Sequence, residues 1–273
     1  MRHAVSAFLQ QHLEILLSSD NPSSRYWERL TPNEQLSLKD TLISIENYSD
    51  GNSNELLNSH SYVFNKTKRW FIRIQEKDFK YARIRTDWPN IVRDQDAITQ
   101  IFEQSSLNLS NFLQLGNYHN DAYYYGNIKE IASLDKKLFR KKSGNSIQRD
   151  EFDLWDIVRF RVVTSGLDSL LEIAISFWET YFDYVLKCRN YYYHPKKNYY
   201  KDPYRAIHFE ICDNYGNPIE IQMVTKYRDA VSFMDHPFVF KKIISFTNFE
   251  HKKWLTELSI KANLLEFSKA DGP

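Results

Sequence analysis

The chain has 273 residues, 42% of them hydrophobic and 26% charged, which is typical of a globular protein with one large domain or two smaller ones. Lys and Arg total 36 against 35 acidic residues, so net charge predicts no nucleic-acid or membrane partner without a local basic patch. The two cysteines exclude a disulfide framework, and neither lies in a CxxC pair. Gln10, His12 and Glu14 interrupt the apolar N-terminal stretch and no long apolar run follows, so we expect a cytoplasmic protein without a membrane segment.

The first part of the chain predicts helices and some β-structure. TPNE at residues 31–34 supplies an N-cap hydroxyl, a proline at the first helical position and a carboxylate at the third, so a helix should begin there and run towards Ser49. The runs SYVFN, KRWFIRIQ and FKYARIR alternate with polar turn residues, which indicates a β-meander near residues 61–85. Another helix is expected at about residues 96–104.

The pattern changes after the polar stretch GNYHND, where we place a domain boundary. Residues 1–120 then form an accessory module of unassigned role, and residues 121–273 form a second domain. In this domain IKEIASLDKKLFRKK has apolar residues at helical spacing from Ile128 onwards, with lysines and arginines between them.

The rest of the second domain alternates strands with helices. LWDIVRFRVV predicts a strand and LDSLLEIAISFWETYF a helix, while YRAIHFEI and IEIQMVT predict an antiparallel hairpin around DNYGNP. KYRDAVSFMDH and HKKWLTELSIKANLLEF read as two further helices. Among the α+β and α/β folds that this order allows, we predict α+β: a mixed β-sheet flanked by helices, preceded by the helical and β-meander module.

Strand parity gathers polar side chains on one face of the predicted hairpin. Residues two apart share a face, so the apolar residues of both strands point one way and a polar set points the other. The polar set is Tyr204, His208, Glu210, Glu220 and Gln222. Such a face is either the wet side of a sheet or the floor of a site. Asp156 begins another strand and could meet Glu220 if the two strands are neighbours, and two converging carboxylates favour a Mg²⁺ site.

The segment RNYYYHPKKNYYKDPYR, residues 189–205, interleaves basic residues with six tyrosines. It is either an exposed basic loop or a site that clamps phosphates and stacks on a base, because guanidinium and ammonium groups bind phosphate while tyrosine rings stack on bases.

Five segments in the same order, from about Ile128 to His236, resemble the synthetase domain of the RelA/SpoT family, which makes guanosine alarmones. IKEIASLDKKLFRK is similar to the family's basic ATP-binding helix, and DIVRFRVV to the strand whose aspartate binds magnesium. RNYYYHPK resembles the KDYIxxPK-like loop, PYRAIH the GYRSLH segment whose tyrosine stacks on the acceptor guanine, and IEIQMVT the EVQIRT strand. The resemblance implies a nucleotidyltransferase-like synthetase core.

The resemblance also implies a reaction, the transfer of pyrophosphate from ATP to a ribose 3′-hydroxyl, with Mg²⁺ as cofactor. Asp156 and Glu220 would bind the metal, Glu220 would accept the hydroxyl proton, and Gln222 would help to orient the acceptor. The residues implied to bind ATP are Lys129, Ser133, Lys137, Arg140 and Arg161. The residues implied to bind the acceptor are Tyr204, which would stack on the base, His208, Lys196, Arg205, Arg189 and Tyr191.

The chain departs from the family pattern where phosphates and the acceptor would bind. Asn127 stands in place of a basic residue, Pro203 in place of a glycine and Val224 in place of an arginine, and the loop before Tyr204 is longer. Three functions therefore stay open. The chain is an alarmone synthetase acting on GDP or GTP, a toxin-like relative that modifies the 3′ end of tRNA and is controlled by an antitoxin or other regulatory protein, or a non-catalytic nucleotide sensor. Retention of Asp156 and Glu220 favours the catalytic readings.

Overall fold

The computed structural model describes residues 30–48, 84–129, 156–192, 205–235 and 249–268, together with the single positions 7, 9, 10, 13 and 14. The β-meander expected over residues 61–85 lies almost entirely outside these ranges, and so does the basic helix expected to begin near Ile128. Ile128 itself is the last residue of a strand and pairs with Val158. The prediction that it begins a helix was therefore wrong.

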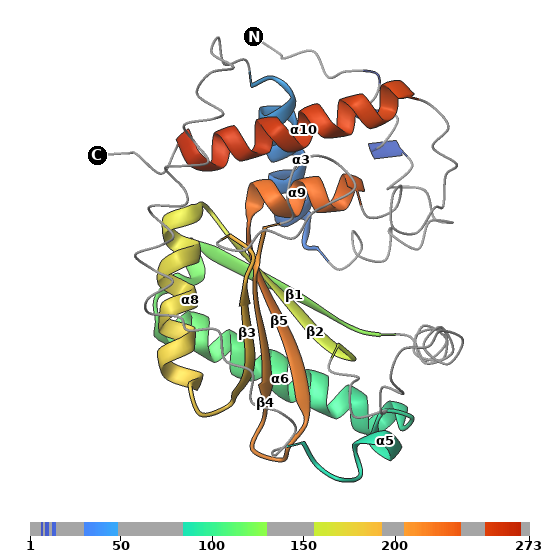
Figure 1. The fold of residues 1–273 in the computed structure, drawn as a ribbon, viewed down its shortest axis with the longest axis vertical. Helices are drawn as coiled ribbons and strands as arrows, with labels where there is room; N and C mark the ends of the chain where they lie inside the picture. The colour runs from blue at the N-terminus through green and yellow to red at the C-terminus, as the bar shows by residue number, and fades with distance from the viewer. Residues whose placement is uncertain are drawn as a thin grey trace, which may run out of the picture.

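A five-stranded mixed sheet forms the centre of the molecule (Figure 1), in the order β1-β2-β5-β4-β3. Its strands are β1 (Ala122–Ile128), β2 (Val158–Thr164), β3 (Val185–Asn190), β4 (Ile207–Cys212) and β5 (Pro218–Thr225). β2 and β5 are parallel, whereas the other neighbouring pairs are antiparallel. The predicted α+β class with a mixed sheet is confirmed.

The β4–β5 hairpin is antiparallel, and its polar and apolar residues alternate as predicted. His208 lies opposite Gln222 and Glu210 opposite Glu220, with apolar pairs such as Phe209 and Ile221 between them. The turn is closed by Asp213, whose Oδ1 accepts hydrogen bonds from two backbone amides, and by Gly216, whose φ of 85° suits glycine. The turn residues Asp213 and Gly216, together with the alternation of polar and apolar residues along both strands, therefore determine this part of the sheet.

The two edge strands of the sheet, β1 and β3, were not predicted from the sequence. β1 has the sequence AYYYGNI, in which three adjacent tyrosines hide the usual alternation of apolar and polar residues. β3 has the sequence VLKCRN and ends at Asn190, so it includes the first two residues of the segment for which a basic loop was one interpretation. Aromatic and β-branched residues favour strands in both cases, but the pairing partner decides whether a strand forms.

The other predicted helices, which fall within the described ranges, are present with some changes in length. α3 (Pro32–Glu46) begins with a complete capping box between Thr31 and Glu34 and ends before Ser49. α6 (Gln95–Leu115) is longer than expected, and α5 (Trp88–Ile91) and a 3₁₀ turn (Tyr118–Asn120) flank it. α8 (Leu167–Tyr181), α9 (Lys226–Asp235) and α10 (Phe249–Ser268) match the predicted C-terminal helices. No described helix is long and apolar enough to cross a membrane.

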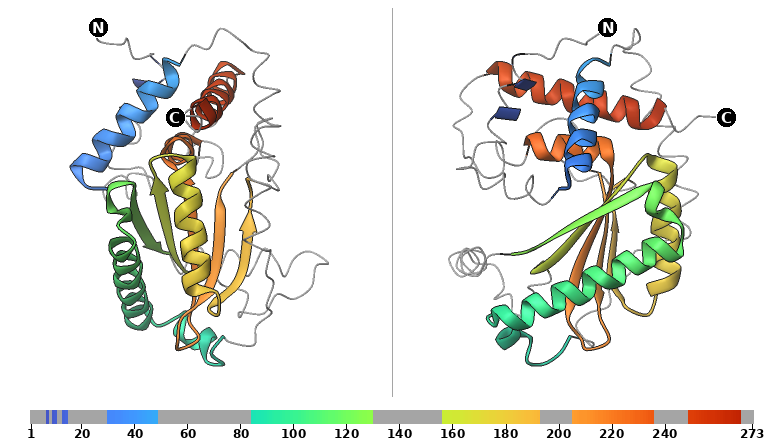
Figure 2. Two further views of the ribbon diagram at one scale, coloured as in Figure 1. Left: turned by 90° about the vertical axis from the view of Figure 1, so that its left-hand side faces the viewer. Right: turned by 180° about the vertical axis from the view of Figure 1, so that it is seen from behind.

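The helices form two groups around the sheet. α6 packs on β1 and β2 and α8 on β2 and β5, and the apolar residues of both helices share one core with Phe160, Phe209 and Ile221. α3, α9 and α10 gather beyond one end of the sheet and have a second core (Figure 2) that includes Leu42 and Leu258. The boundary near residue 120 stays a prediction, although α3 and α6 both pack on elements that follow it.

Gly126→Ala should destabilise the protein, because Gly126 lies opposite Phe160 in the sheet and has no room for a side chain. An added Cβ would stand 2.5 Å from Phe160 Cδ1 and 2.8 Å from Phe102 Cε2, in rings stacked 5.0 Å apart. Overpacking of this kind costs about 1–3 kcal/mol, which denaturant unfolding would detect as a lower midpoint. Gly166→Ala is the matched control, since nothing lies within 4 Å of its added Cβ. Equal losses in the two variants would contradict the packing explanation.

Candidate active site

The polar face of the sheet carries two rows of residues that cross all five strands. Hydrogen-bonded register places one residue from each strand side by side in each row. The first row is Tyr125, Arg161, Gln222, His208 and Arg189, and the second is Asn127, Arg159, Glu220, Glu210 and Lys187. Helices α6 and α8 pack on the apolar side chains that alternate with these residues, so the rows lie on the opposite face.

Glu220 occupies the middle of this face and is not a solvated surface carboxylate. Its side chain is 13% exposed, and the side chain of His208 beside it is 14% exposed. His208 Nδ1 lies 3.6 Å from Glu220 Oε1, and the Gln222 side-chain amide donates a hydrogen bond to that same oxygen. Partial burial with two polar neighbours keeps one carboxylate oxygen in a defined position, as a proton acceptor requires.

A chain of side chains continues from Gln222 into helix α9. Arg161 Nη2 donates to Gln222 Oε1 at 2.8 Å, and Arg161 Nη1 lies 3.1 Å from Asp229 Oδ1. The Tyr125 hydroxyl donates to that carboxylate oxygen at 2.6 Å. Arg161, which we predicted to bind ATP phosphates, thus connects a buried carboxylate to the amide that orients Glu220.

Asp229 is fully buried and was missed by the sequence analysis. Burial raises its pKa, while the Arg161 charge and the Tyr125 hydroxyl act in the opposite direction. Burial also raises the pKa of Tyr125 well above its ordinary value, so Tyr125 remains a hydrogen-bond donor. Its sequence position, a carboxylate in the first turn of a helix, does not reveal this burial, which depends on contacts with distant segments.

Asp156 lies just before β2, next to Lys129, which follows the end of β1. Lys129 Nζ is 2.5 Å from Asp156 Oδ2, and the backbone amide of Lys129 donates to Ile157 O at 2.8 Å. The strand that Asp156 precedes is the direct neighbour of the strand that carries Glu220. The fold therefore brings the predicted metal ligand together with a predicted ATP contact, at the end of the sheet remote from α9.

The donor chemistry at Asp156 and Glu220 fits Mg²⁺, which prefers oxygen ligands and commonly takes one or two carboxylates plus water and substrate phosphates. Within the described ranges, no group of three or more His, Cys, Asp or Glu side chains could hold a metal ion. A metal shared by Asp156 and Glu220 would thus depend on substrate oxygens, and the site stays a prediction.

The predicted acceptor contacts at the edge of the sheet lie together. Arg189 Nη1 is 3.5 Å from Glu210 Oε1, and desolvation, which lowers the pKa of Arg189, is outweighed by Glu210 and Tyr191. The Tyr191 ring meets His208 edge-on at 5.0 Å. Arg205, by contrast, is buried, with 3% of its surface exposed, and its predicted contact with acceptor phosphates stays a prediction.

The remaining predicted site residues lie outside the described ranges, and their roles stay predictions. They are Ser133, Lys137, Arg140, Lys196 and Tyr204. Arg159 lies between Asn127 and Glu220 in the second row, so it has an acidic residue as its neighbour. Its Nε atom is buried and has no hydrogen-bond partner among the described residues, and Arg159 is a further cation beside the central carboxylate.

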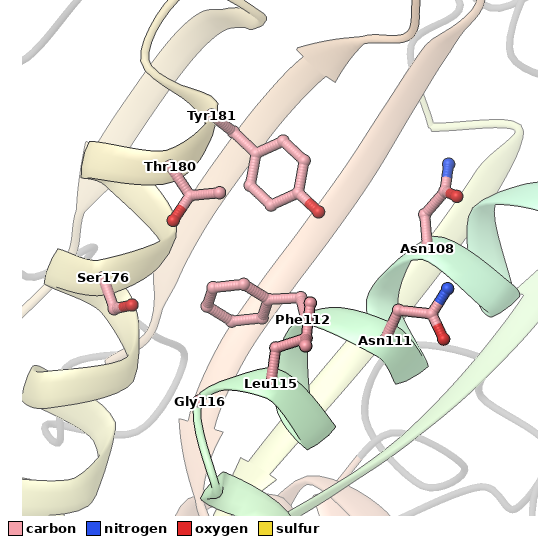
Figure 3. Close-up of a pocket in the computed structure, with 8 residues that line it drawn as sticks. All are labelled: Asn108, Asn111, Phe112, Leu115, Gly116, Ser176, Thr180 and Tyr181. Atoms are coloured by element: carbon pink, nitrogen blue, oxygen red, sulfur yellow. The ribbon is translucent and has the colours of Figure 1, made fainter.

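Two hollows lie on the opposite, helix-covered side of the sheet. One, of about 400 Å³, opens between α6 and α8 and is lined by uncharged side chains such as Asn108, Thr180 and Tyr181 (Figure 3). The second, of about 280 Å³, shares Asn108 and Tyr181 and reaches Ile221. Neither contains a predicted site residue, so the polar rows and not these hollows define the candidate site.

Three solved structures with a similar fold are two small alarmone synthetases and a GTP pyrophosphokinase family protein. The small alarmone synthetase 2 from Bacillus subtilis is 21% identical, with a TM-score of 0.52 over 67% of this chain and 96% of that one. A GTP pyrophosphokinase family protein from Streptococcus pneumoniae is 22% identical, with a TM-score of 0.53 over 69% and 93%. The small alarmone synthetase 1 from B. subtilis, bound to its product pppGpp, is 19% identical, with a TM-score of 0.50 over 66% and 94%.

A family model described as the region found in RelA/SpoT proteins matches residues 126–244. This segment is similar to that region of RelA/SpoT proteins, which confirms the resemblance drawn from the five motifs. No curated protein sequence matches the chain.

Arg161→Met should destabilise the fold, because it leaves the Asp229 carboxylate buried without its paired cation. Breaking a buried ion pair from one side typically costs about 3–5 kcal/mol. Arg189→Met is the matched control: Arg189 is 42% exposed, and such surface pairs contribute about 0–1 kcal/mol. Adding Asp229→Asn to Arg161→Met should recover part of the loss. Urea unfolding of the variants measures this, and similar midpoints for Arg161→Met and Arg189→Met would refute the role of the pair.

Proposed function

We propose that the chain is a pyrophosphokinase that transfers pyrophosphate from ATP to the ribose 3′-hydroxyl of GDP or GTP. The observation that carries the proposal is the placement of Glu220 between Gln222 and His208 on the polar face. A relative of the same fold is described as bound to its product pppGpp, which supports a guanine nucleotide as the acceptor.

In this reaction the acceptor 3′-oxygen bonds to the β-phosphorus of ATP, the bond from that phosphorus to the α–β bridging oxygen breaks, and AMP leaves. Glu220 would take the hydroxyl proton, and its fixed position beside Gln222 and His208 supports that role. Gln222, oriented by Arg161, would hold the Glu220 carboxylate in the correct position relative to the acceptor hydroxyl. A non-catalytic nucleotide sensor transfers no proton, so it would not need a carboxylate held in this way.

Cations beside Glu220 supply the charge that a polyphosphate substrate needs. Arg159 is the neighbour of Glu220 in the register, and Lys129 lies beside Asp156. Mg²⁺, when bound, neutralises charge on the transferred group, and Asp156 and Glu220 would hold it together with substrate oxygens. The protein's part is to position these charges before the substrate arrives.

A tRNA 3′ end is the second candidate acceptor, and the surroundings of Val224 favour it. Val224 replaces the arginine of the family pattern and packs with Val163 and Ala206 in a small apolar cluster on the site face. One phosphate contact usual for a nucleotide acceptor is therefore missing. The longer loop before Tyr204 adds lysines that a larger polyanion could use.

Glu220→Gln should abolish most activity while leaving the fold intact. The amide keeps the size and the hydrogen bonding of the carboxylate but cannot accept the proton, and loss of a general base costs about 10²- to 10⁴-fold in rate. Product formation from labelled ATP measures this. Glu172→Gln, on the exposed face of α8, is the control and should retain the parent rate. Activity of Glu220→Gln within a fewfold of the parent would exclude a catalytic role.

Tyr204→Ala should weaken acceptor binding by roughly 1–3 kcal/mol if its ring stacks on a base, and ATP binding should change little. Tyr204→Phe keeps the ring and is the matched control. Rates across a salt series, measured with GTP and with bulk tRNA, identify the acceptor because a polyanion brings a steep salt dependence. Transfer to tRNA with none to guanine nucleotides would replace the first proposal by the second, and an unchanged acceptor response in Tyr204→Ala would remove the stacking role.

A further inference from the structure

Helix α10 contributes a fully buried carboxylate, Glu266, that lies outside the family-matched segment. It accepts hydrogen bonds from the Tyr192 hydroxyl at 2.8 Å and the Thr225 hydroxyl at 2.6 Å, both at Oε1. Arg228 Nε donates to Oε2 at 3.3 Å, which also pairs the buried charge with a cation. A carboxylate without exposure is stable only with such compensation, so these contacts specify where α10 sits.

The donors to Glu266 come from the ends of the elements that carry the site. Thr225 is the last residue of β5, which carries Glu220 and Gln222. Tyr192 follows the end of β3 by two residues, and β3 carries Arg189. Arg228 lies in the first turn of α9, next to Asp229. One carboxylate therefore joins the strand of the proposed base to the segment of the predicted acceptor contacts.

The segment next to Tyr192 is positioned by a small set of further contacts. The backbone amide of Tyr191 donates to Ala206 O at 2.8 Å, and the amide of Tyr192 donates to Asn190 Oδ1 at 3.0 Å. The Tyr191 ring meets His208, which itself lies beside Glu220. Burial raises the pKa of the Tyr192 phenol, so that hydroxyl stays a donor. A shift of Tyr192 would thus be transmitted to Tyr191 and Arg189.

We propose that Glu266 is a positioning residue for acceptor binding, and that α10 is part of the catalytic unit. By accepting the hydrogen bond of Tyr192, Glu266 keeps Arg189 and Tyr191 in position relative to Glu220. α10 is itself braced by the N-terminal helix α3, since Trp254 Nε1 donates to Glu46 Oε1 at 3.2 Å and Lys261 Nζ donates to Glu46 O at 2.6 Å. This inference rests on the proposed function for its kinetic consequence.

The sharpest test is Tyr192→Phe, which removes one donor to Glu266 and leaves the ring in place. Tyr124→Phe is the matched control, because the Tyr124 hydroxyl also bonds to a helix, at Ser106 O and 3.0 Å, but behind the sheet. We expect the acceptor KM to rise roughly tenfold in Tyr192→Phe, with the ATP KM and kcat nearly unchanged, since small misplacements of binding groups weaken productive binding. Tyr124→Phe should leave all three constants at the parent values.

Hydrogen exchange separates failure of this inference from failure of the proposed function. Faster exchange of the backbone amides at residues 189–192 in both Tyr192→Phe and Glu266→Gln, but not in Tyr124→Phe, is expected whether or not the parent transfers pyrophosphate. If the parent has no such activity, the proposed function fails while faster exchange still supports the structural link. An unchanged acceptor KM in an active Tyr192→Phe, or unchanged exchange at residues 189–192, overturns the inference. Should Glu266→Gln fail to fold, Tyr192→Phe decides alone.

Discussion

The parallel pairing of β2 with β5 is the constraint on which the rest of the site depends. It places Arg159 beside Glu220 and Arg161 beside Gln222, although these residues belong to segments separated by helix α8 and the β3–β4 hairpin. A slip of one residue would turn each of these side chains to the opposite face, into the core beneath α6 and α8. The apolar residues between them, such as Phe160 and Ile221, prevent that slip because they must remain buried.

A face that carries so many charges in partly buried positions is stable because the charges compensate one another. Arg161 pairs with Asp229, Lys129 with Asp156, and Arg189 with Glu210. Each pair costs desolvation, so such pairs specify geometry more than they add stability. The phosphates of a bound substrate would compete with these carboxylates for the same Arg and Lys side chains. Each cation would then exchange its carboxylate partner for a phosphate.

Helices from both ends of the described chain close one end of the sheet. α3, α9 and α10 share an apolar core, and two buried carboxylates extend from this layer into the sheet. Asp229 reaches Arg161 in β2, and Glu266 reaches Thr225 at the end of β5. The family match ends at residue 244, yet α10 contacts the segment after β3, so the packed unit of the fold extends beyond the matched region.

Sequence alone determined the features whose signals are local. The capping box at Thr31 and Glu34, the hairpin closed by Asp213 and Gly216, and the polar parity of Glu220 with Gln222 all follow from residues a few positions apart. The motif order also indicated the family, since each motif is a short contiguous string.

Tertiary structure decided what depends on contacts between distant segments. The edge strands β1 and β3 form because neighbours pair with them, and α6 extends to Leu115 because the sheet buries its apolar face. Asp229 and Glu266 looked like ordinary charged residues of amphipathic helices. Their partners lie 68 and 74 residues away in the chain, at Arg161 and Tyr192. Burial of a charge is a property of packing, and periodicity within one helix contains no information about which distant cation or hydroxyl will meet it.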